Sequence, residues 1–456
     1  MATTAETSPA PVRPEHDTRP RRAQLVGRAR DAADLARSTR VGRLTVAGAA
    51  TVVLVLLAGA LALVAVLRVD AASSDVVTRS GPLTAAAQEL YRALSDADAA
   101  AAEGFLAGSA EPPEVRLRYQ TDITAAGAAL AAATRATAVP ASAADDPATR
   151  LATGLPVYTG TVETARTFDR QRVSVGAGYL REASSFLQTT LLPAARAIYD
   201  EQSAELADQQ AVADGDAVTV LAALAVAGAL VAVVALHRRV AGTTKRRVTP
   251  GLVLAAAALG LALVWGVAAV GAASLLMHSA AGHGSTPNRG AVASRFAVLQ
   301  SRGDDILTLV ARGAGASYEA SYTDRSLRYL GWRGDLQQAQ EATDDPGVAA
   351  DLADARTAAY AAITVHNRVR SLDAAGNVDE AVVLALSSAP GGGSATVAGT
   401  GEALGRAIDA TGQSAATDAS AASAAMTLLA LGVVVLTLVA VGGVVAGLWP
   451  RLQEYR

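Results

Sequence analysis

Four long runs of apolar residues divide the chain into alternating apolar and polar parts. The runs cover residues 44–67, 217–236, 251–277 and 426–449, and none of them contains Asp, Glu, Lys or Arg. An α-helix needs roughly 20 apolar residues to cross about 30 Å of hydrocarbon, so each run is long enough to span a bilayer. The pattern predicts four transmembrane helices.

Two large polar blocks separate the apolar runs. Residues 68–216 form a block of 149 residues, and residues 278–425 form a block of 148. Only the short loop 237–250 lies between the second and third runs. The chain therefore consists of one arrangement, helix–block–helix, written twice.

A fixed offset supports this repeat. The first run ends at Leu67 and the third at Met277, which are 210 positions apart. The same offset relates the dipeptide Arg118-Tyr119 of the first block to Arg328-Tyr329 of the second. We interpret the chain as a tandem duplication whose halves have diverged.

Charge predicts which side of the membrane each part occupies. The segments 1–43, 237–250 and 450–456 together hold 16 basic and 6 acidic residues, whereas the two blocks hold 23 basic and 36 acidic residues. Short basic segments stay in the cytoplasm. We expect a multi-pass plasma-membrane protein with both termini inside and both blocks outside. The tail 1–43 should be largely disordered, and the basic segments should contact anionic membrane lipid.

Composition predicts that both blocks are helical, because Ala, Leu, Arg and Glu favour the helix. Breaks at Gly and Pro residues predict four helices in the first block, at 83–107, 113–138, 145–190 and 194–216, and Pro156 is a candidate interruption of the third. In the second block they predict helices at 290–313, 317–343, 347–372 and 377–388, and a last helix that runs from 396 into the fourth apolar run. Short loops favour antiparallel neighbours. The predicted fold class is an all-α membrane protein: four transmembrane helices with two extracellular antiparallel four-helix-bundle domains arranged as a tandem repeat.

The sequence offers little for catalysis. It contains no cysteine, which excludes disulfides and thiol chemistry, and no nucleophile elbow, His-Glu-x-x-His motif, phosphate loop or kinase signature. The apolar runs also lack the ionisable groups that ion-coupled transporters place inside the membrane. We expect no enzyme activity, no cofactor, no metal site and no nucleic-acid partner.

The second block contains a candidate ligand or partner surface. Aromatic and basic residues recur there at spacings of four and three, which places them on one helix face. They are Tyr318, Tyr322, Arg325, Tyr329 and Trp332, with Arg328 beside them. Guanidinium groups bind carboxylates and aromatic rings offer rigid contact area. The alternative is a bundle core past which arginine reaches solvent.

Two further sets of residues are candidates for contacts. In the first block, a polar run interrupts an apolar helix, either as an inward-facing ligand or partner contact or as a solvated helix face: Tyr91, Arg92, Ser95, Asp96 and Asp98. A cytoplasmic contact is expected at the basic residues of the central loop: Arg238, Arg239, Lys245, Arg246 and Arg247.

The chain resembles the GlnX-type membrane proteins of actinobacteria. The resemblance rests on two spans around an external bundle, repeated twice, on an Ala-, Gly- and Arg-rich composition with little lysine, and on local matches at 90–98, 105–106, 118–119 and 122–123. It implies a sensory relay in which an amino-acid-binding lipoprotein of the GlnH type docks outside and a serine/threonine kinase of the PknG type receives the signal inside. No defined motif allows functional residues to be transferred.

The residues themselves favour a function of the same kind. The cytoplasmic segments are too short to fold an output enzyme, and helices that continue into the membrane can pass on a small shift. We expect a non-enzymatic transmembrane signalling protein that relays an external binding event to a cytoplasmic effector such as a kinase. The event expected is amino-acid availability sensed with a solute-binding lipoprotein. A homo-oligomer is compatible with the sequence. The alternative is a structural or envelope-assembly scaffold, or a permease-like subunit of a larger export complex.

Overall fold

The computed structural model describes residues 40–108, 111–134, 146–213, 217–243, 249–279 and 286–453, and these residues contain helices and no strands. The chain forms two compact units. The span unit comprises residues 1–62, 222–264 and 432–456, and the lobe unit comprises residues 63–221 and 265–431. Most of the tail predicted to be disordered lies outside the described residues.

Four helices hold the four apolar runs. They are α2 (Arg40–Asp75), α8 (Ala217–Thr243), α9 (Pro250–Ser279) and α15 (Gly393–Gln453). Each is long and apolar enough to cross a membrane. The prediction of an all-α, multi-pass membrane protein with four spans is thereby confirmed.

Glycine allows two of the span helices to approach closely within the span unit. A methyl group built on Gly251 of α9 would lie 2.5 Å from the carbonyl oxygen of Gly443 and 2.6 Å from the backbone nitrogen of Gly447, both on α15. Small residues at such positions permit the backbone contact that drives helix association in lipid. Around this crossing, Val55, Ala229 and Val444 belong to the core of the unit.

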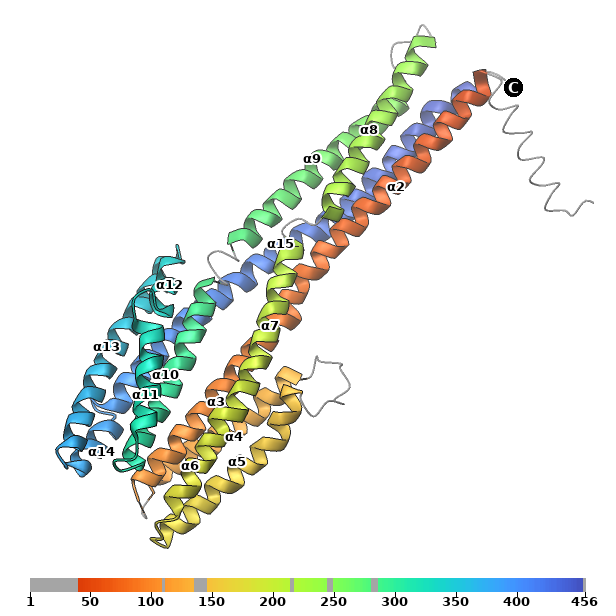
Figure 1. The fold of residues 1–456 in the computed structure, drawn as a ribbon. Helices are drawn as coiled ribbons and strands as arrows, with labels where there is room; N and C mark the ends of the chain where they lie inside the picture. The colour runs from red at the N-terminus through yellow and green to blue at the C-terminus, as the bar shows by residue number, and fades with distance from the viewer. Residues whose placement is uncertain are drawn as a thin grey trace, which may run out of the picture. The chain divides into compact units, whose positions relative to one another are not determined.

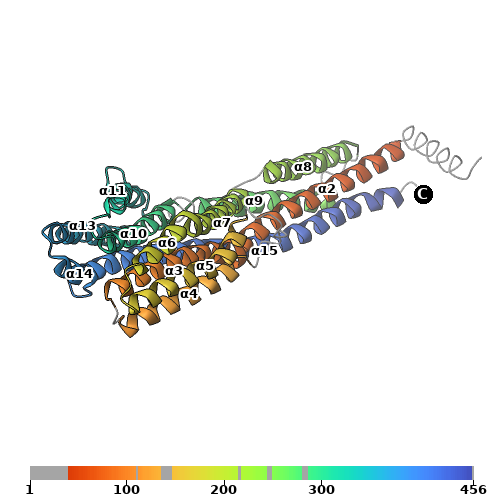
Figure 2. The ribbon, with the colours of Figure 1, turned by 60° about the horizontal axis from the view of Figure 1, so that its bottom comes forward.

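The first block folds into helices that gather around α3. They are η1 (Val76–Ser80), α3 (Gly81–Leu106), α4 (Pro113–Thr134), α5 (Pro147–Arg170), α6 (Gly176–Phe186), η2 (Leu187–Leu191) and α7 (Leu192–Ala213), and Figures 1 and 2 show α4, α5, α6 and α7 beside α3. Both η segments are π-helical turns that leave the helix axis continuous.

The structure differs from the helices predicted at 145–190 and 194–216. The chain turns at residues 171–175, inside the first of them, whereas the candidate interruption Pro156 lies within α5. In that turn, Arg172 adopts a φ of 58°, and the N–H of Val173 donates to the carbonyl of Phe168 at 2.9 Å, which is the hydrogen bond of a Schellman cap. Glycine is the usual residue at this position, so the arginine gave no sequence signal for the end of the helix. The break predicted at Pro193 is absent, because α6, η2 and α7 follow one another without a turn.

The second block follows a similar order of helices. They are α10 (Thr286–Val310), α11 (Ala316–Leu330), α12 (Asp335–Glu341), α13 (Pro346–Ala374) and α14 (Val378–Leu386), followed by the first half of α15. The helix predicted at 317–343 is divided at residues 331–334, where Gly331 is extended and Arg333 has a φ of 56°. Helix α15 continues from Gly393 through the fourth run, as the sequence predicts.

One hydrophobic core joins the two blocks inside the lobe unit. It includes Leu94 and Leu187 from the first block and Phe296 and Leu352 from the second. Helices α3 and α10 pack against each other across the two blocks. The sequence predicts two separate bundle domains; in the lobe unit the helices of both blocks share this core.

Candidate functional site

Helix α3 directs three residues of the predicted polar run into the interior. Tyr91, Ser95 and Asp98 are spaced four and three apart, so they share one helix face, and all three are buried. The ring of Tyr91 stacks on Phe296 of α10 with centroids 3.8 Å apart. This face therefore lies where the two blocks meet and is not solvated.

Asp98 is a fully buried carboxylate with partners from two other helices. The hydroxyl of Tyr158 on α5 donates to its Oδ1 at 3.1 Å, and the hydroxyl of Ser184 on α6 donates to its Oδ2 at 2.5 Å. Burial raises the pKa of Asp98 to about 6, against the opposing effect of the two hydroxyl donors. The carboxyl group thus ties three helices together and titrates near neutral pH.

The other two residues of the polar run, Arg92 and Asp96, are half-buried and form ion pairs. Arg92 donates to Asp96 at 2.5 Å and to Glu89 at 2.6 and 2.8 Å, and Asp122 of α4 lies 3.9 Å away. Burial, together with the nearby Asp96, raises the pKa of Asp122 to about 6. Arg92 therefore connects α3 to α4 on the side of α3 that leaves the core.

A charged link joins the two blocks through Glu103, whose side chain is almost fully buried. Arg118 of α4 approaches Glu103 at 2.9 Å, and Arg302 of α10 donates to the other carboxylate oxygen. The neighbouring Tyr119 is buried beneath the guanidinium of Arg166, whose central carbon lies 4.1 Å from the ring centroid. The Arg-Tyr pair of the first block is therefore structural.

Helix α11 does present its aromatic residues on one face, and that face is turned inward. Tyr322 and Tyr329 are buried, and Tyr318 is partly buried. Arg325 pairs with the fully buried Asp304 of α10. Burial of the phenol raises the pKa of Tyr329 to about 12.

The remaining two residues of this set point to solvent. Arg328 is exposed and pairs with Asp324. Trp332 lies beyond the end of α11 and is 91% exposed, with Leu327 exposed on the last turn of the helix. The predicted surface thus divides into a buried aromatic part and a small exposed part around Trp332.

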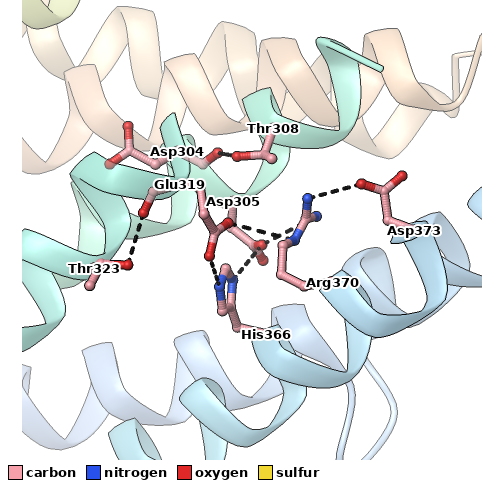
Figure 3. A network of polar contacts seen from close by, with 8 residues as sticks. All are labelled: Asp304, Asp305, Thr308, Glu319, Thr323, His366, Arg370 and Asp373. Atoms are coloured by element: carbon pink, nitrogen blue, oxygen red, sulfur yellow. Dashed lines mark hydrogen bonds and ion pairs between the residues drawn. The ribbon is translucent and has the colours of Figure 1, made fainter. Parts of the chain in front are cut away.

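A histidine network that was not among the predicted site residues contacts the buried part through Tyr322, and Figure 3 shows its charged members. His366 of α13 is buried, with its Nδ1 2.9 Å from Asp305 and its Nε2 3.0 Å from Glu319. Tyr322 stacks on its ring at a centroid distance of 3.7 Å. Burial alone would lower the pKa of His366, but the two carboxylates together raise it above its ordinary value.

Arg370 extends this network along α13. Its guanidinium lies 3.8 Å from Asp305, 3.9 Å from Glu319 and 3.2 Å from Asp373. His366 and Arg370 are four residues apart, which is the spacing of one helix face. A histidine and an arginine four residues apart on one helix, in a block that also holds Asp305 and Glu319, are the sequence signal that could have predicted this network.

The cytoplasmic candidates are described only in part. Arg238 and Arg239 are exposed near the end of α8. Lys245, Arg246 and Arg247 lie outside the described residues. Among the residues that the structure describes, no group of three or more His, Cys, Asp or Glu side chains is arranged to hold a metal ion.

The arrangement is suited to coupling helices rather than to exposing a reactive group. Asp98, Glu103 and His366 each bring together side chains of three helices, and each lies in the shared lobe. Such buried ionic groups are sensitive to small shifts, because removing one partner leaves a costly unpaired charge.

Comparison with known proteins gives one match. Residues 72–211 match the family model described as an actinobacterial sensor domain. No curated protein and no solved structure matches the chain. The matched segment begins near the end of α2 and includes α3 to most of α7, and thus contains Asp98, Glu103 and their partners in the first block. The first block of this chain is similar to actinobacterial sensor domains, which supports a sensory protein.

Proposed function

We propose that this protein is a non-enzymatic transmembrane sensor that relays an external binding event to a cytoplasmic effector. The observation that carries the proposal is the sensor-domain match over residues 72–211, a segment whose first residues belong to a helix long and apolar enough to span a membrane. In this proposal both blocks lie outside the plasma membrane and both termini lie in the cytoplasm, as the charge distribution indicates.

The continuity of two helices supports a mechanical relay. Helix α15 runs from the lobe unit through the fourth apolar run, and α2 leads from the first run into η1 and α3. Just beyond these runs, the Ser423 hydroxyl of α15 donates to Asp70 of α2 at 2.8 Å. A shift of one helix in the lobe is therefore transmitted to its span and to its neighbour, in the manner of a two-state helix displacement.

The binding event that we propose is amino-acid availability, presented by a solute-binding lipoprotein, and the effector is a serine/threonine kinase. The exposed residues Trp332, Leu327 and Arg328 provide a contact for the lipoprotein, since exposed aromatic side chains and arginine are typical of binding hot spots. Arg238 and Arg239 provide a cationic contact for the kinase.

Site-specific photocrosslinking in intact actinobacterial cells tests this proposal. A photoreactive phenylalanine analogue replaces Trp332 in one variant and Arg238 in another, and a third variant carries it at the partly exposed Thr161 as a control. We expect the Trp332 variant to capture an amino-acid-binding lipoprotein, the Arg238 variant to capture a kinase, and the Thr161 variant to capture neither.

Other captured proteins would decide against the relay. If both variants captured only components of an export or envelope-assembly complex, the scaffold or permease-like alternative would replace it. If neither variant captured a partner above the Thr161 control, the proposed partners would be wrong.

A further inference from the structure

A cavity of about 410 Å³ lies among helices of the two blocks in the lobe unit. It is lined from η1, α3, α7, α10 and α15. On α15 its residues run from Ile408 to Ala416, so at 1.5 Å per residue they lie roughly 15–27 Å along the helix before Met426. Its size is within the range of small-molecule sites.

The two blocks contribute equivalent positions to this cavity. At the offset of 210 that relates the halves, Tyr199 corresponds to Asp409 and Ser203 to Gln413, and all four line the cavity. Tyr199 and Ser203 belong to α7, the last helix of the first block, and the other two belong to α15, the corresponding helix of the second. The cavity therefore lies between the repeats, where a change in one block meets the other.

The lining carries one positive and one negative group. Arg289 is exposed at the start of α10 and Asp409 is exposed on α15. Neutral amides lie between the helices at Gln88, Asn288 and Gln413. A site with one charge of each sign favours a ligand with no net charge and two separated poles, whereas a dianion or a dication would face an unfavourable partner.

An unpaired acceptor adds to this preference. The Oδ1 atom of Asn288 is buried and has no hydrogen-bond partner among the described residues. An unsatisfied buried acceptor is costly, and an ammonium or amide donor from a ligand would satisfy it. Val76, Leu206 and Ile408 supply an apolar part of the wall.

We propose that this cavity binds a small zwitterionic organic molecule, with its anionic pole toward Arg289 and its cationic pole toward Asp409 and Asn288. This inference rests on the proposed sensory function and adds a ligand class that the chain itself recognises, independently of any binding partner.

The wall of the cavity includes the π-helical turn between α2 and α3, so a bound ligand would contact the segment that leads into the first apolar run. Pro82 has no N–H and cannot continue the normal hydrogen-bond pattern, and the N–H of Gly81 donates to the carbonyl of Val76, five residues earlier. A methyl group on Gly81 would lie 2.6 Å from that carbonyl, so the turn requires glycine. Val76, Gly81 and Pro82 all line the cavity, and a ligand there contacts the π-turn that joins α2 to α3. Such turns are frequent at functional sites.

Calorimetric titration of the purified full-length protein in nanodiscs tests the proposal. The probes are glycine, L-serine and L-leucine as zwitterions, succinate as a dianion and putrescine as a dication. The concentration of each probe is raised to about 10 mM, at which a site with a Kd near 1 mM is about 90% occupied. We expect at least one zwitterion to bind and to slow hydrogen exchange of the backbone at 76–84, and we expect succinate and putrescine not to bind.

Three variants locate the site. Arg289→Gln and Asp409→Asn should each weaken zwitterion binding roughly tenfold or more, since each removes a charged hydrogen-bond partner. Ala416→Trp should abolish binding by filling the cavity. Arg170→Gln and Glu402→Gln remove exposed charges that do not line the cavity and should bind as the unmodified protein does. Thermal unfolding midpoints of all five variants confirm that they fold.

The outcomes separate this inference from the proposed function. Binding of no probe, equal binding of succinate or putrescine, or unchanged binding by the two charge variants would each overturn the inference. None of these results depends on a lipoprotein or a kinase. Failure of the crosslinking experiment would overturn the proposed relay and leave a zwitterion site in place.

Discussion

At the scale of single residues, the lobe unit buries ionisable groups and surrounds each with partners from other helices. Asp98 accepts hydrogen bonds from α5 and α6, and His366 lies between carboxylates of α10 and α11. Tyr91, Ser95 and Asp98 appear in the sequence as a polar interruption of an apolar helix, and that pattern located them. It did not show which way they face, because their partners lie up to 205 positions away, at Phe296.

The Asp98 carboxyl group should make stability depend on pH. Because burial raises its pKa to about 6, the folded protein retains a proton that the unfolded chain releases, and stability falls as pH rises from about 4 to about 6. Asp98→Asn removes this titration while keeping polar atoms for Tyr158 and Ser184. Asp122, whose pKa is also raised to about 6, titrates over the same interval in both proteins. We expect the unmodified protein to lose about 2–3 kcal/mol more stability over this interval than Asp98→Asn does, measured by thermal unfolding in detergent.

The exposed Asp324→Asn variant is the control for this measurement, and its profile should follow that of the unmodified protein. Parallel profiles for Asp98→Asn and Asp324→Asn would show that Asp98 does not titrate in the folded state in the way its burial indicates.

The His366 network should also make the protein less stable as pH rises. The cause differs, because here the charged form of the side chain is stabilised, whereas at Asp98 the neutral form is. The two carboxylates raise the pKa of His366, so the stabilisation is complete below its ordinary value near 6.5 and is lost as pH rises through the higher folded value. His366→Gln should therefore destabilise the protein more at pH 6 than at pH 9 in denaturant titrations. Tyr322→Leu removes the stacked ring but leaves His366 and its carboxylate partners in place. It should therefore lower the free energy of unfolding by the same amount at pH 6 and at pH 9. Equal losses for His366→Gln at pH 6 and pH 9 would contradict this account.

At the scale of helices, the sequence predicted elements with strong patterns and missed turns with unusual residues. The four apolar runs and the continuous helix from residue 393 into the fourth run were predictable from composition alone. The turns at 171–175 and 331–334 were not, because arginine occupies the left-handed position at Arg172 and Arg333, where glycine is the usual signal. Pro156, a candidate interruption of the helix predicted at 145–190, does not end α5.

The crossing of α9 and α15 gives a test at this scale. Gly251→Leu places a side chain where a methyl group would already lie 2.5 Å from the carbonyl oxygen of Gly443. We expect a destabilisation of about 1–3 kcal/mol, the usual cost of overpacking, measured by unfolding in mixed detergent micelles. Gly260→Leu is the matched control, because that position of the same helix has nothing within 4 Å of an added methyl group. The same loss from both variants would mean that the crossing does not stabilise the span unit.

At the scale of the whole molecule, the two blocks share one lobe. The tandem duplication stays a prediction, made from the spacing of the apolar runs and from one dipeptide. The shared core was not predictable, because the residues that form it, such as Tyr91 and Phe296, carry no motif that specifies pairing between the blocks. In the proposed relay, a ligand or partner that shifts either block acts through the shared core on α2 and α15, the two helices that continue from the lobe unit into an apolar run.

The orientation of the chain in the membrane is the claim on which the relay depends, and cysteine labelling measures it directly. The chain has no cysteine, so Thr153→Cys in the first block and Thr243→Cys at the end of α8 each introduce a single thiol. In intact cells, a membrane-impermeant maleimide should label Thr153→Cys, and it should label Thr243→Cys only after the membrane is permeabilised. Labelling of Thr243→Cys in intact cells, with Thr153→Cys protected, would place the lobe in the cytoplasm and contradict the proposed sensor.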